Sequence, residues 1–181
     1  LSVKSIQTVK VFLSAAEASS DQHGASLMRA LQKYAKKHDA IQFDFFGMGG
    51  PAMRAEGLRT IQPAESLLAM GFVEILKLLP RFFCALKKLT QSFESEKPAF
   101  AVVIDYPDFH FQLRKRLKHS TVPFIYMIPP KVWIWRSGRV QFLKKYFKQV
   151  LCIFPFEEAW FKLRGVPAVS IGNPLFDQID F

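Results

Sequence analysis

The chain has 181 residues, of which 50% are hydrophobic and 14% aromatic, so it is long and apolar enough for one packed globular domain, residues 1–181. Lys and Arg outnumber Asp and Glu by 25 to 15, and the net charge of +10 favours an anionic partner, whether a phosphorylated ligand, nucleic acid or a membrane surface. Cys84 and Cys152 stand alone in apolar surroundings, which excludes a disulfide framework, and we expect neither a metal nor another cofactor.

Apolar runs bounded by turn residues alternate with helical patterns along the chain. The runs lack apolar/polar alternation, as expected for strands buried on both faces, and cover residues 9–15, 41–46, 99–104, 122–128, 149–154 and 167–171. Helical patterns cover residues 21–37, 72–93, 109–119, 138–147 and 156–164. This order predicts an α/β fold, namely a Rossmann-like, open, mainly parallel sheet with helices on both faces.

Unusual clusters follow the predicted strands. In chain order they are "AEASSD", "GMGGP", "DYPD", "PPKVWIWR", "PFEE" and "GNP". Because ligands of such sheets bind outside the carboxyl ends of the strands, the clusters predict a functional cleft at this edge.

The first two clusters each allow two interpretations. Ser19 and Asp21 suit the N-cap of the following helix, but with Glu17 they also suit a helix N-terminus that faces the hydroxyl groups of a ligand. Gly47 and Gly50 belong either to a plain turn or to a site where the backbone approaches a ligand closely.

Residues 70–89 are apolar at helical spacing, with basic residues between. Glu74, Lys77, Pro80 and Arg81 interrupt the segment, which argues against a membrane span. It is either a core helix or an amphipathic segment, broken at Pro80, whose apolar side chains enter lipid while Lys and Arg meet the headgroups. In the second interpretation the lipid contacts are Phe72, Leu79, Phe82 and Phe83.

The segment "VVIDYPDFHF" contains the candidate general base. Asp105 ends a buried strand before a Pro-containing turn, where partial desolvation raises the pKa of a carboxylate and its strength as a base. Asp108 suits the N-cap of the next helix. His110, between Phe109 and Phe111, is typical of a packed or solvated imidazole.

Two tryptophans follow the next strand. Trp133 and Trp135 share one side of an extended segment, where they pack as core, stack on a sugar ring or form a cleft wall. Arg136 and Arg139 add phosphate-binding capacity.

In order and separation, "AAEASSD", "GMGGPAMRAEG", "LLAMGFVEIL", "IDYPDF", "VWIWR", "FPFE" and "IGNPLFD" resemble the N-terminal half of the lipid-A-disaccharide synthase family, over residues 9–177. The resemblance implies the acceptor-binding first lobe of a two-lobed GT-B glycosyltransferase. It also implies an inverting hexosyltransferase that moves 2,3-diacylglucosamine from its UDP donor to 2,3-diacylglucosamine 1-phosphate, forming the β(1→6) disaccharide of lipid A biosynthesis and releasing UDP.

The resemblance assigns the catalytic role to Asp105, which would take the proton of the acceptor 6-hydroxyl. We expect the acceptor site or its cleft to be lined by Glu17, Ser19, Asp21, Gly47, Gly50, Met70, Gly71, Glu74, Asp108, Trp133, Trp135 and Arg136. The chain departs from the family's usual residues at Ala16, Ser20, His110, Pro129, Lys131 and Asn173. At position 110 the family commonly has Asn, and at position 131 it usually has Ser.

The donor lobe of the family would follow this chain, which starts with Leu1 and stops at Phe181. We therefore expect a segment of a longer polypeptide, inactive alone, that is cytoplasmic and peripherally attached to the anionic inner membrane of a Gram-negative bacterium. No nucleic acid is expected as a partner. Two alternatives stay open: another UDP-sugar glycosyltransferase or epimerase of the same build, and a non-enzymatic basic Rossmann module that binds nucleic acid.

Overall fold

A computed structural model describes residues 6–37, 41–67, 72–132 and 138–172, with residues 72–78 described for the backbone alone. Seven parallel strands form one sheet in the order β3-β2-β1-β4-β5-β6-β7. The strands are β1 (Gln7–Ala15), β2 (Ile41–Gly49), β3 (Arg59–Pro63), β4 (Phe100–Ile104), β5 (Phe124–Met127), β6 (Gln149–Cys152) and β7 (Ala168–Ser170). The helices are α1 (Ala18–Lys37), α2 (Pro51–Ala55), η1 (Ala64–Leu67), α3 (Phe72–Glu96), α4 (Pro107–Arg116), α5 (Arg139–Tyr146) and α6 (Pro155–Lys162).

This topology confirms the predicted Rossmann-like sheet and locates its switch point. β1 and β4 are hydrogen-bonded neighbours, from Val11 opposite Phe100 to Ala15 opposite Ile104, although most of the first half of the chain lies between them. On one side of this pair the strands succeed one another toward β3, and on the other toward β7. Ligands of open α/β sheets bind at the carboxyl ends of the strands where the order reverses in this way.

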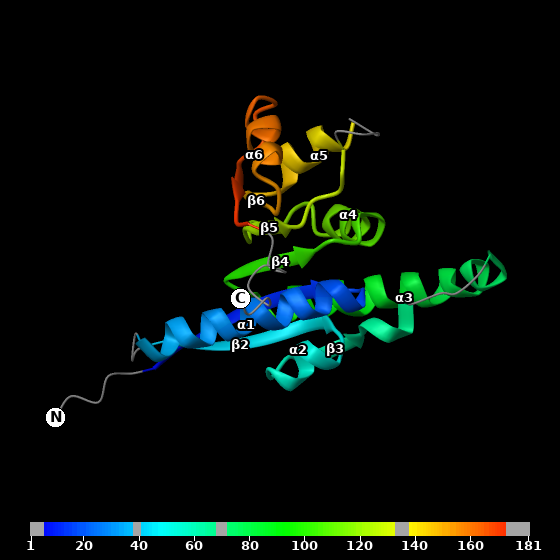
Figure 1. The fold of residues 1–181 in the computed structure, drawn as a ribbon. Coiled ribbons are helices and arrows are strands. Elements are labelled where there is room, and N and C mark those ends of the chain that lie inside the picture. The colour runs from blue at the N-terminus through cyan, green and yellow to red at the C-terminus, as the bar shows by residue number, and fades with distance from the viewer. Residues whose placement is uncertain (1–5, 38–40, 68–71, 133–137, 173–181) are drawn as a thin grey trace, which may run out of the picture.

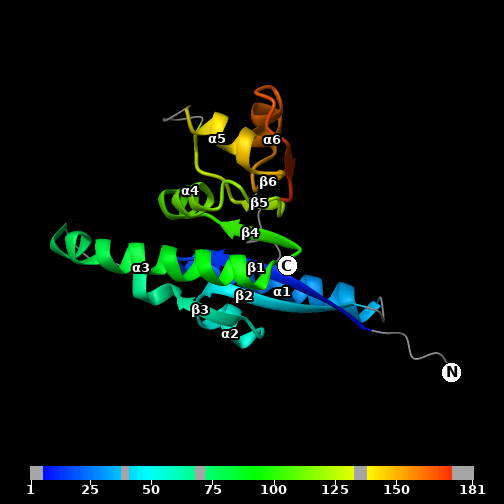
Figure 2. The same ribbon diagram turned by 180° about the vertical axis from the view of Figure 1, so that it is seen from behind.

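The helices divide between the two faces of the sheet. Figures 1 and 2 show α1 in front of the sheet in one view and α3 in front of it in the opposite view. In both views the first turns of α3 project beyond the carboxyl ends of the strands. The start of α3 therefore lies at the same end of the molecule as the switch point.

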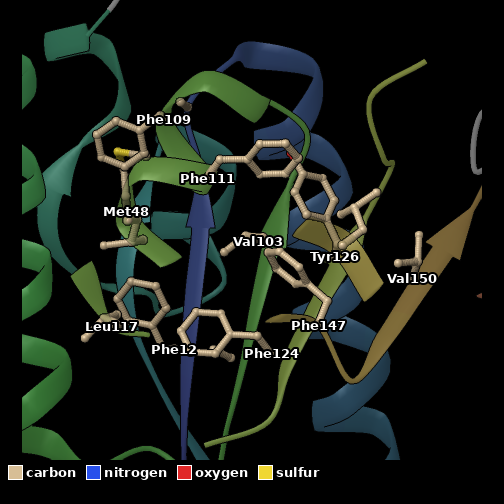
Figure 3. Close-up of a cluster of buried hydrophobic side chains, with 14 of the residues drawn as sticks. Phe12, Met48, Val103, Phe109, Phe111, Leu117, Phe124, Tyr126, Phe147 and Val150 are labelled. Atoms are coloured by element: carbon tan, nitrogen blue, oxygen red, sulfur yellow. The ribbon is translucent and has the colours of Figure 1, made fainter. Parts of the chain in front are cut away.

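The side chains of β1 explain why both faces are covered. Phe12 belongs to one buried cluster, with residues of α3 and α4, whereas Val11 and Leu13 belong to the other, with residues of α1 and α2. Successive side chains of a strand point to opposite faces, so a run of apolar residues needs a core on each side. Figure 3 shows the first cluster, in which Phe12 makes edge-to-face contacts with Phe46 and Phe93, with ring centroids 5.5 and 5.2 Å apart.

Two expectations about the first half of the chain were wrong or incomplete. The sequence did not indicate α2 and β3, because a five-residue helix and an edge strand with exposed Arg59 and Pro63 carry no long apolar run. The break at Pro80 that the amphipathic interpretation included does not occur, since α3 continues through this residue.

Candidate functional site

A cavity of about 460 Å³ opens at the carboxyl edge of the sheet, beside the switch point. It is formed by the residues that follow β4 and β5 and by the first residue of α5. Its lining consists of Asp105, Pro107, Asp108, Ile128, Pro129, Pro130, Lys131, Val132 and Arg139.

Asp105 enters this cavity from a constrained backbone. The residue directly follows β4, its N–H donates to the carbonyl of Met127 at 3.0 Å, and α4 begins at Pro107. Asp105 and Tyr106 have φ values of +53° and +46°, so two consecutive residues with side chains adopt the left-handed conformation. This tight reversal joins the strand to the helix and leaves the Asp105 side chain at the cavity wall.

The half-buried position of Asp105 changes its acidity. Burial raises the pKa of the Asp105 carboxyl above its ordinary value. The backbone hydrogen bond of Tyr106 and the positive charges of His23 and Lys131 act in the opposite direction without cancelling the effect. A carboxylate with a raised pKa accepts a proton more readily, as a general base requires.

Glu17 and His23 are electrostatically coupled to Asp105 from the adjacent β1–α1 segment. Burial raises the pKa of Glu17, and the negative charge of Asp105 raises it further. Burial lowers the pKa of His23, and the negative charge of Asp105 partly offsets this lowering. Within the described residues, Nδ1 of His23 is a buried side-chain nitrogen with no hydrogen-bond partner. Sequence reasoning did not single out His23, which lies two residues beyond the cluster that follows β1.

Asp21 lies at the same edge but has a structural role. The side chain is only 3% exposed, and its carboxylate accepts hydrogen bonds from the backbone N–H groups of Gly50, Ala52 and Met53 at 2.7, 2.8 and 3.1 Å. Asp21 therefore caps α2, a helix distant in sequence. The alternative that Ser19 and Asp21 are N-caps of their own helix is wrong, since both lie inside α1.

The two glycines of the second cluster allow close contacts within the protein. A Cβ atom at Gly50 would lie 2.6 Å from an oxygen of Asp21. Gly47 has a φ of +140°, and a Cβ atom there would lie 2.0 Å from the carbonyl oxygen of Leu13 on β1. The backbone at both positions thus approaches other parts of this chain.

Ser20, one of the departures from the family's usual residues, lies in the first turn of α1. Its hydroxyl accepts a hydrogen bond from the N–H of Glu17 at 2.9 Å and donates to the carbonyl of the same residue at 2.8 Å. Ser19 is exposed in the same first turn of the helix.

Asp108 is not the N-cap of α4, contrary to expectation. The N-cap is Tyr106, and Asp108 lies in the first turn of the helix, exposed at the cavity and ion-paired with Arg139. The guanidinium of Arg139 also lies over the ring of Phe111, 5.3 Å from its centroid. α5 thereby contributes a cation to a cavity wall that otherwise carries Lys131 as its basic residue.

The proposed lipid-contacting residues of α3 have different environments. Phe82 packs against the core, with its ring centroid 5.1 Å from that of Phe109. Leu79 and Phe83, one helical turn apart, are 47% and 53% exposed. Only the backbone is described at Phe72 and Glu74.

Several predicted residues lie outside the described part of the chain: Met70, Gly71, Trp133, Trp135, Arg136 and Asn173. Among the described residues, no cluster of three or more His, Cys, Asp or Glu has an arrangement that could hold a metal ion. No described helix combines the length and hydropathy needed to cross a membrane.

Comparison with known proteins gives the same family as the motifs. A family model described as Lipid-A-disaccharide synthetase matches residues 11–181. Lipid-A-disaccharide synthase of Solibacter usitatus is 39% identical over 166 residues, which are 92% of this chain and 42% of that protein. The enzymes of Koribacter versatilis and Myxococcus xanthus are 40% and 38% identical, over 92% and 94% of this chain and 43% of each relative. The chain thus spans less than half the length of these curated relatives.

A solved structure resembles the fold. The crystal structure of UDP-GlcNAc 2-epimerase from Neisseria meningitidis bound to UDP-GlcNAc aligns with a TM-score of 0.61 at 11% sequence identity. The alignment covers 94% of this chain and 47% of the epimerase chain. At this identity the likeness concerns the fold alone.

Proposed function

The chain belongs to the lipid-A-disaccharide synthetase family, and we propose from this premise that it is the acceptor-binding lobe of a two-lobed, GT-B type hexosyltransferase of lipid A biosynthesis. The enzyme would transfer 2,3-diacylglucosamine from its UDP donor to 2,3-diacylglucosamine 1-phosphate. The observation that carries the proposal is Asp105, a half-buried carboxylate with a raised pKa in a cavity beside the β1/β4 switch point. The donor lobe would lie outside this chain, which spans 42% of the Solibacter relative.

In the proposed mechanism Asp105 is the general base. Its carboxylate removes the proton of the acceptor 6-hydroxyl while that oxygen forms a bond to the anomeric carbon of the donor. The bond between the anomeric carbon and the diphosphate oxygen breaks, its electrons pass to the diphosphate, and UDP leaves. Attack opposite the leaving group inverts the anomeric configuration and gives the β(1→6) linkage.

The charges of the cavity suit the proposed acceptor. Lys131 and Arg139 are the basic residues among the described lining, and their positive charge complements the acceptor 1-phosphate. Glu17, whose pKa is raised by burial and by Asp105, lies outside this lining, in a pocket that it shares with Asp21 and Gly50, and would offer its carboxyl group to sugar hydroxyls there. Met70, Gly71, Glu74, Trp133, Trp135 and Arg136 remain proposed lining residues of the acceptor site on the strength of the motifs alone.

We also propose that the protein works at the cytoplasmic surface of the inner membrane, as a peripheral protein. A diacylated acceptor resides in a lipid bilayer, and exposed Leu79 and Phe83 offer apolar contact on the first half of α3. The net charge of +10 adds attraction to anionic headgroups. Phe82, packed on Phe109, would anchor this surface to the core while its neighbours enter the lipid.

The reaction can be tested with the full-length protein. UDP-2,3-diacylglucosamine and 2,3-diacylglucosamine 1-phosphate together should yield the disaccharide 1-phosphate and UDP, whereas either substrate alone should yield nothing. Isomerisation of a UDP-sugar without an acceptor would contradict the proposal and support an epimerase. Transfer to a polar, non-acylated sugar alone would support another UDP-sugar glycosyltransferase.

The membrane contact can be tested with two adjacent phenylalanines. Phe83→Ser should weaken binding of the full-length protein to anionic phospholipid vesicles and leave its unfolding midpoint close to wild type, because the side chain is largely exposed. Phe82→Ser, the matched variant, should lower the free energy of unfolding by about 2 kcal/mol through lost burial. Unchanged vesicle binding by a Leu79→Ser/Phe83→Ser double variant would refute the proposed contact.

A further inference from the structure

A buried hydrogen-bonded chain lies directly behind the proposed base. His110, on the first turns of α4, is 0% exposed. Its Nδ1 lies 2.5 Å from the carbonyl oxygen of Asp105, and its Nε2 lies 2.8 Å from the hydroxyl of Ser14 on β1. The hydroxyl of Tyr126, on β5, donates to the same Asp105 carbonyl at 2.8 Å. Two elements, α4 and β5, thus donate to one peptide group, and β1 supports the α4 donor through Ser14.

The partners of His110 define its tautomer. A carbonyl oxygen only accepts hydrogen bonds, so Nδ1 must carry the proton that it shares with Asp105. Nε2 then has a free lone pair and accepts the hydroxyl proton of Ser14. Burial lowers the pKa of His110 to about 4, which keeps the ring neutral at pH 7. Aromatic contacts with Phe109 and Tyr126 fix the plane of the ring.

The peptide that His110 and Tyr126 hold has an unfavourable backbone. Asp105 and Tyr106 both have positive φ, a conformation in which the Cβ atom crowds the following carbonyl. Such a backbone persists only where the surrounding structure determines it. The Asp105 carbonyl belongs to the peptide that links these two residues, so its two hydrogen bonds fix the rotation of the strained unit. The direction of the Asp105 side chain depends on that rotation.

We propose that His110 is a positioning residue, which, as a neutral Nδ1–H imidazole supported by Ser14, holds the Asp105–Tyr106 peptide in the orientation that directs the Asp105 carboxylate into the cavity. This role rests on the proposed function of Asp105 as a base. It also accounts for an imidazole at a position where the family commonly has Asn, because an Asn amide can place an N–H donor near the location of Nδ1. For holding the Asp105 carbonyl, the essential feature would be the N–H donor and not the imidazole ring.

Two amide substitutions at position 110 distinguish the contribution of Nδ1 from that of Nε2. In the full-length enzyme, His110→Asn places a donor where Nδ1 lies and loses the link to Ser14. His110→Gln places its amide near Nε2 and leaves the Asp105 carbonyl without this donor. We expect kcat of His110→Asn to stay within about threefold of wild type and kcat of His110→Gln to fall at least about tenfold, with little change in KM, since misplaced catalytic groups lower the rate steeply.

Equal kcat values for the Asn and Gln variants would overturn the proposal, as would a larger loss for Asn than for Gln. The unfolding midpoints of His110→Asn and His110→Gln serve as the control. If both midpoints fall by the same amount, lost stability does not explain a kcat that falls in the Gln variant alone. Asp105→Asn in the same assay tests the base itself. If that variant keeps wild-type turnover, the proposed function fails whatever His110 does.

The tautomer of His110 can also be measured in the wild-type enzyme, so this test does not depend on whether a variant folds. The ¹⁵N chemical shifts of the His110 ring at pH 7 should show a neutral imidazole protonated at Nδ1. An Nε2–H tautomer or an imidazolium would contradict the proposal independently of any activity.

Discussion

Asp21 and Asp105 are carboxylates at the same edge of the same sheet, yet they have opposite surroundings. Asp21 is surrounded by backbone donors, and its oxygens accept the N–H groups of Gly50, Ala52 and Met53. Asp105 lies on a cavity wall, and its environment raises its pKa through burial. Asp21 is thus used for stability, whereas Asp105 remains available to a ligand.

The comparison shows that position at a binding edge does not make a carboxylate catalytic. A carboxylate whose oxygens accept hydrogen bonds from fixed backbone donors links two parts of the structure. A charge that the fold desolvates without enough donors is a stronger base, and its ionised form costs stability. Substitutions at the two sites should therefore affect different quantities.

The largest effect on stability is expected for Asp21→Ala. The substitution leaves three backbone N–H groups of the α2 region without their acceptor, so the free energy of unfolding should fall by about 3 kcal/mol. Urea unfolding of the full-length protein measures the loss, and hydrogen exchange should show reduced protection of the Ala52 and Met53 amides. Wild-type protection of these amides would mean that Asp21 does not hold α2.

A smaller effect is expected for Gly50→Ala. Its Cβ would lie 2.6 Å from an Asp21 oxygen, so the carboxylate must move and stability should fall by about 1–3 kcal/mol. Gly138→Ala is the matched control, because no atom of the described residues lies within 4 Å of its Cβ position and its φ of −59° suits alanine. Equal unfolding midpoints for the two variants would show that the contact with Asp21 is not restrictive.

The smallest effect is expected for Lys131→Met, which changes the electrostatics of Asp105. The positive charge of Lys131 lowers the pKa of Asp105, so its removal should move the acid limb of the kcat–pH profile to higher pH. Lys131→Arg retains the charge and should leave the limb in place. A shift to lower pH in the Met variant would mean that Asp105 does not control this limb.

The sequence predicted the parts of the site that follow from a single local pattern. The apolar run of β4 ends at Asp105, so both the strand and the candidate base were recognisable, and the order of strands and helices indicated the sheet. The roles of Asp21 and His110 were not recognisable, because their partners at Gly50 and Ser14 are distant along the chain. Asp108 looked like a cap because aspartate often is one, but two residues in the left-handed conformation start α4 earlier than the pattern suggests.

The two carboxylates should respond differently to loss of their charge. A pKa raised by folding contributes stability at pH values below the ordinary carboxyl pKa, and this contribution is lost as pH rises through the folded pKa. At pH 7 the ionised Asp105 is therefore a cost to stability, and an uncharged Asn should relieve it. Asp105→Asn should unfold at or above the wild-type midpoint, whereas Asp21→Asn should unfold below it.

The role of Asp105 as the base can be measured through the turnover of full-length Asp105→Asn at pH 7, on protein with at least wild-type stability. We expect a kcat at least about 100-fold below wild type, because a general base is lost. Asp108→Asn, which removes an exposed carboxylate from the same cavity, provides the comparison and should lose much less. Turnover of Asp105→Asn close to that of the wild type would contradict the assignment of Asp105 as the base.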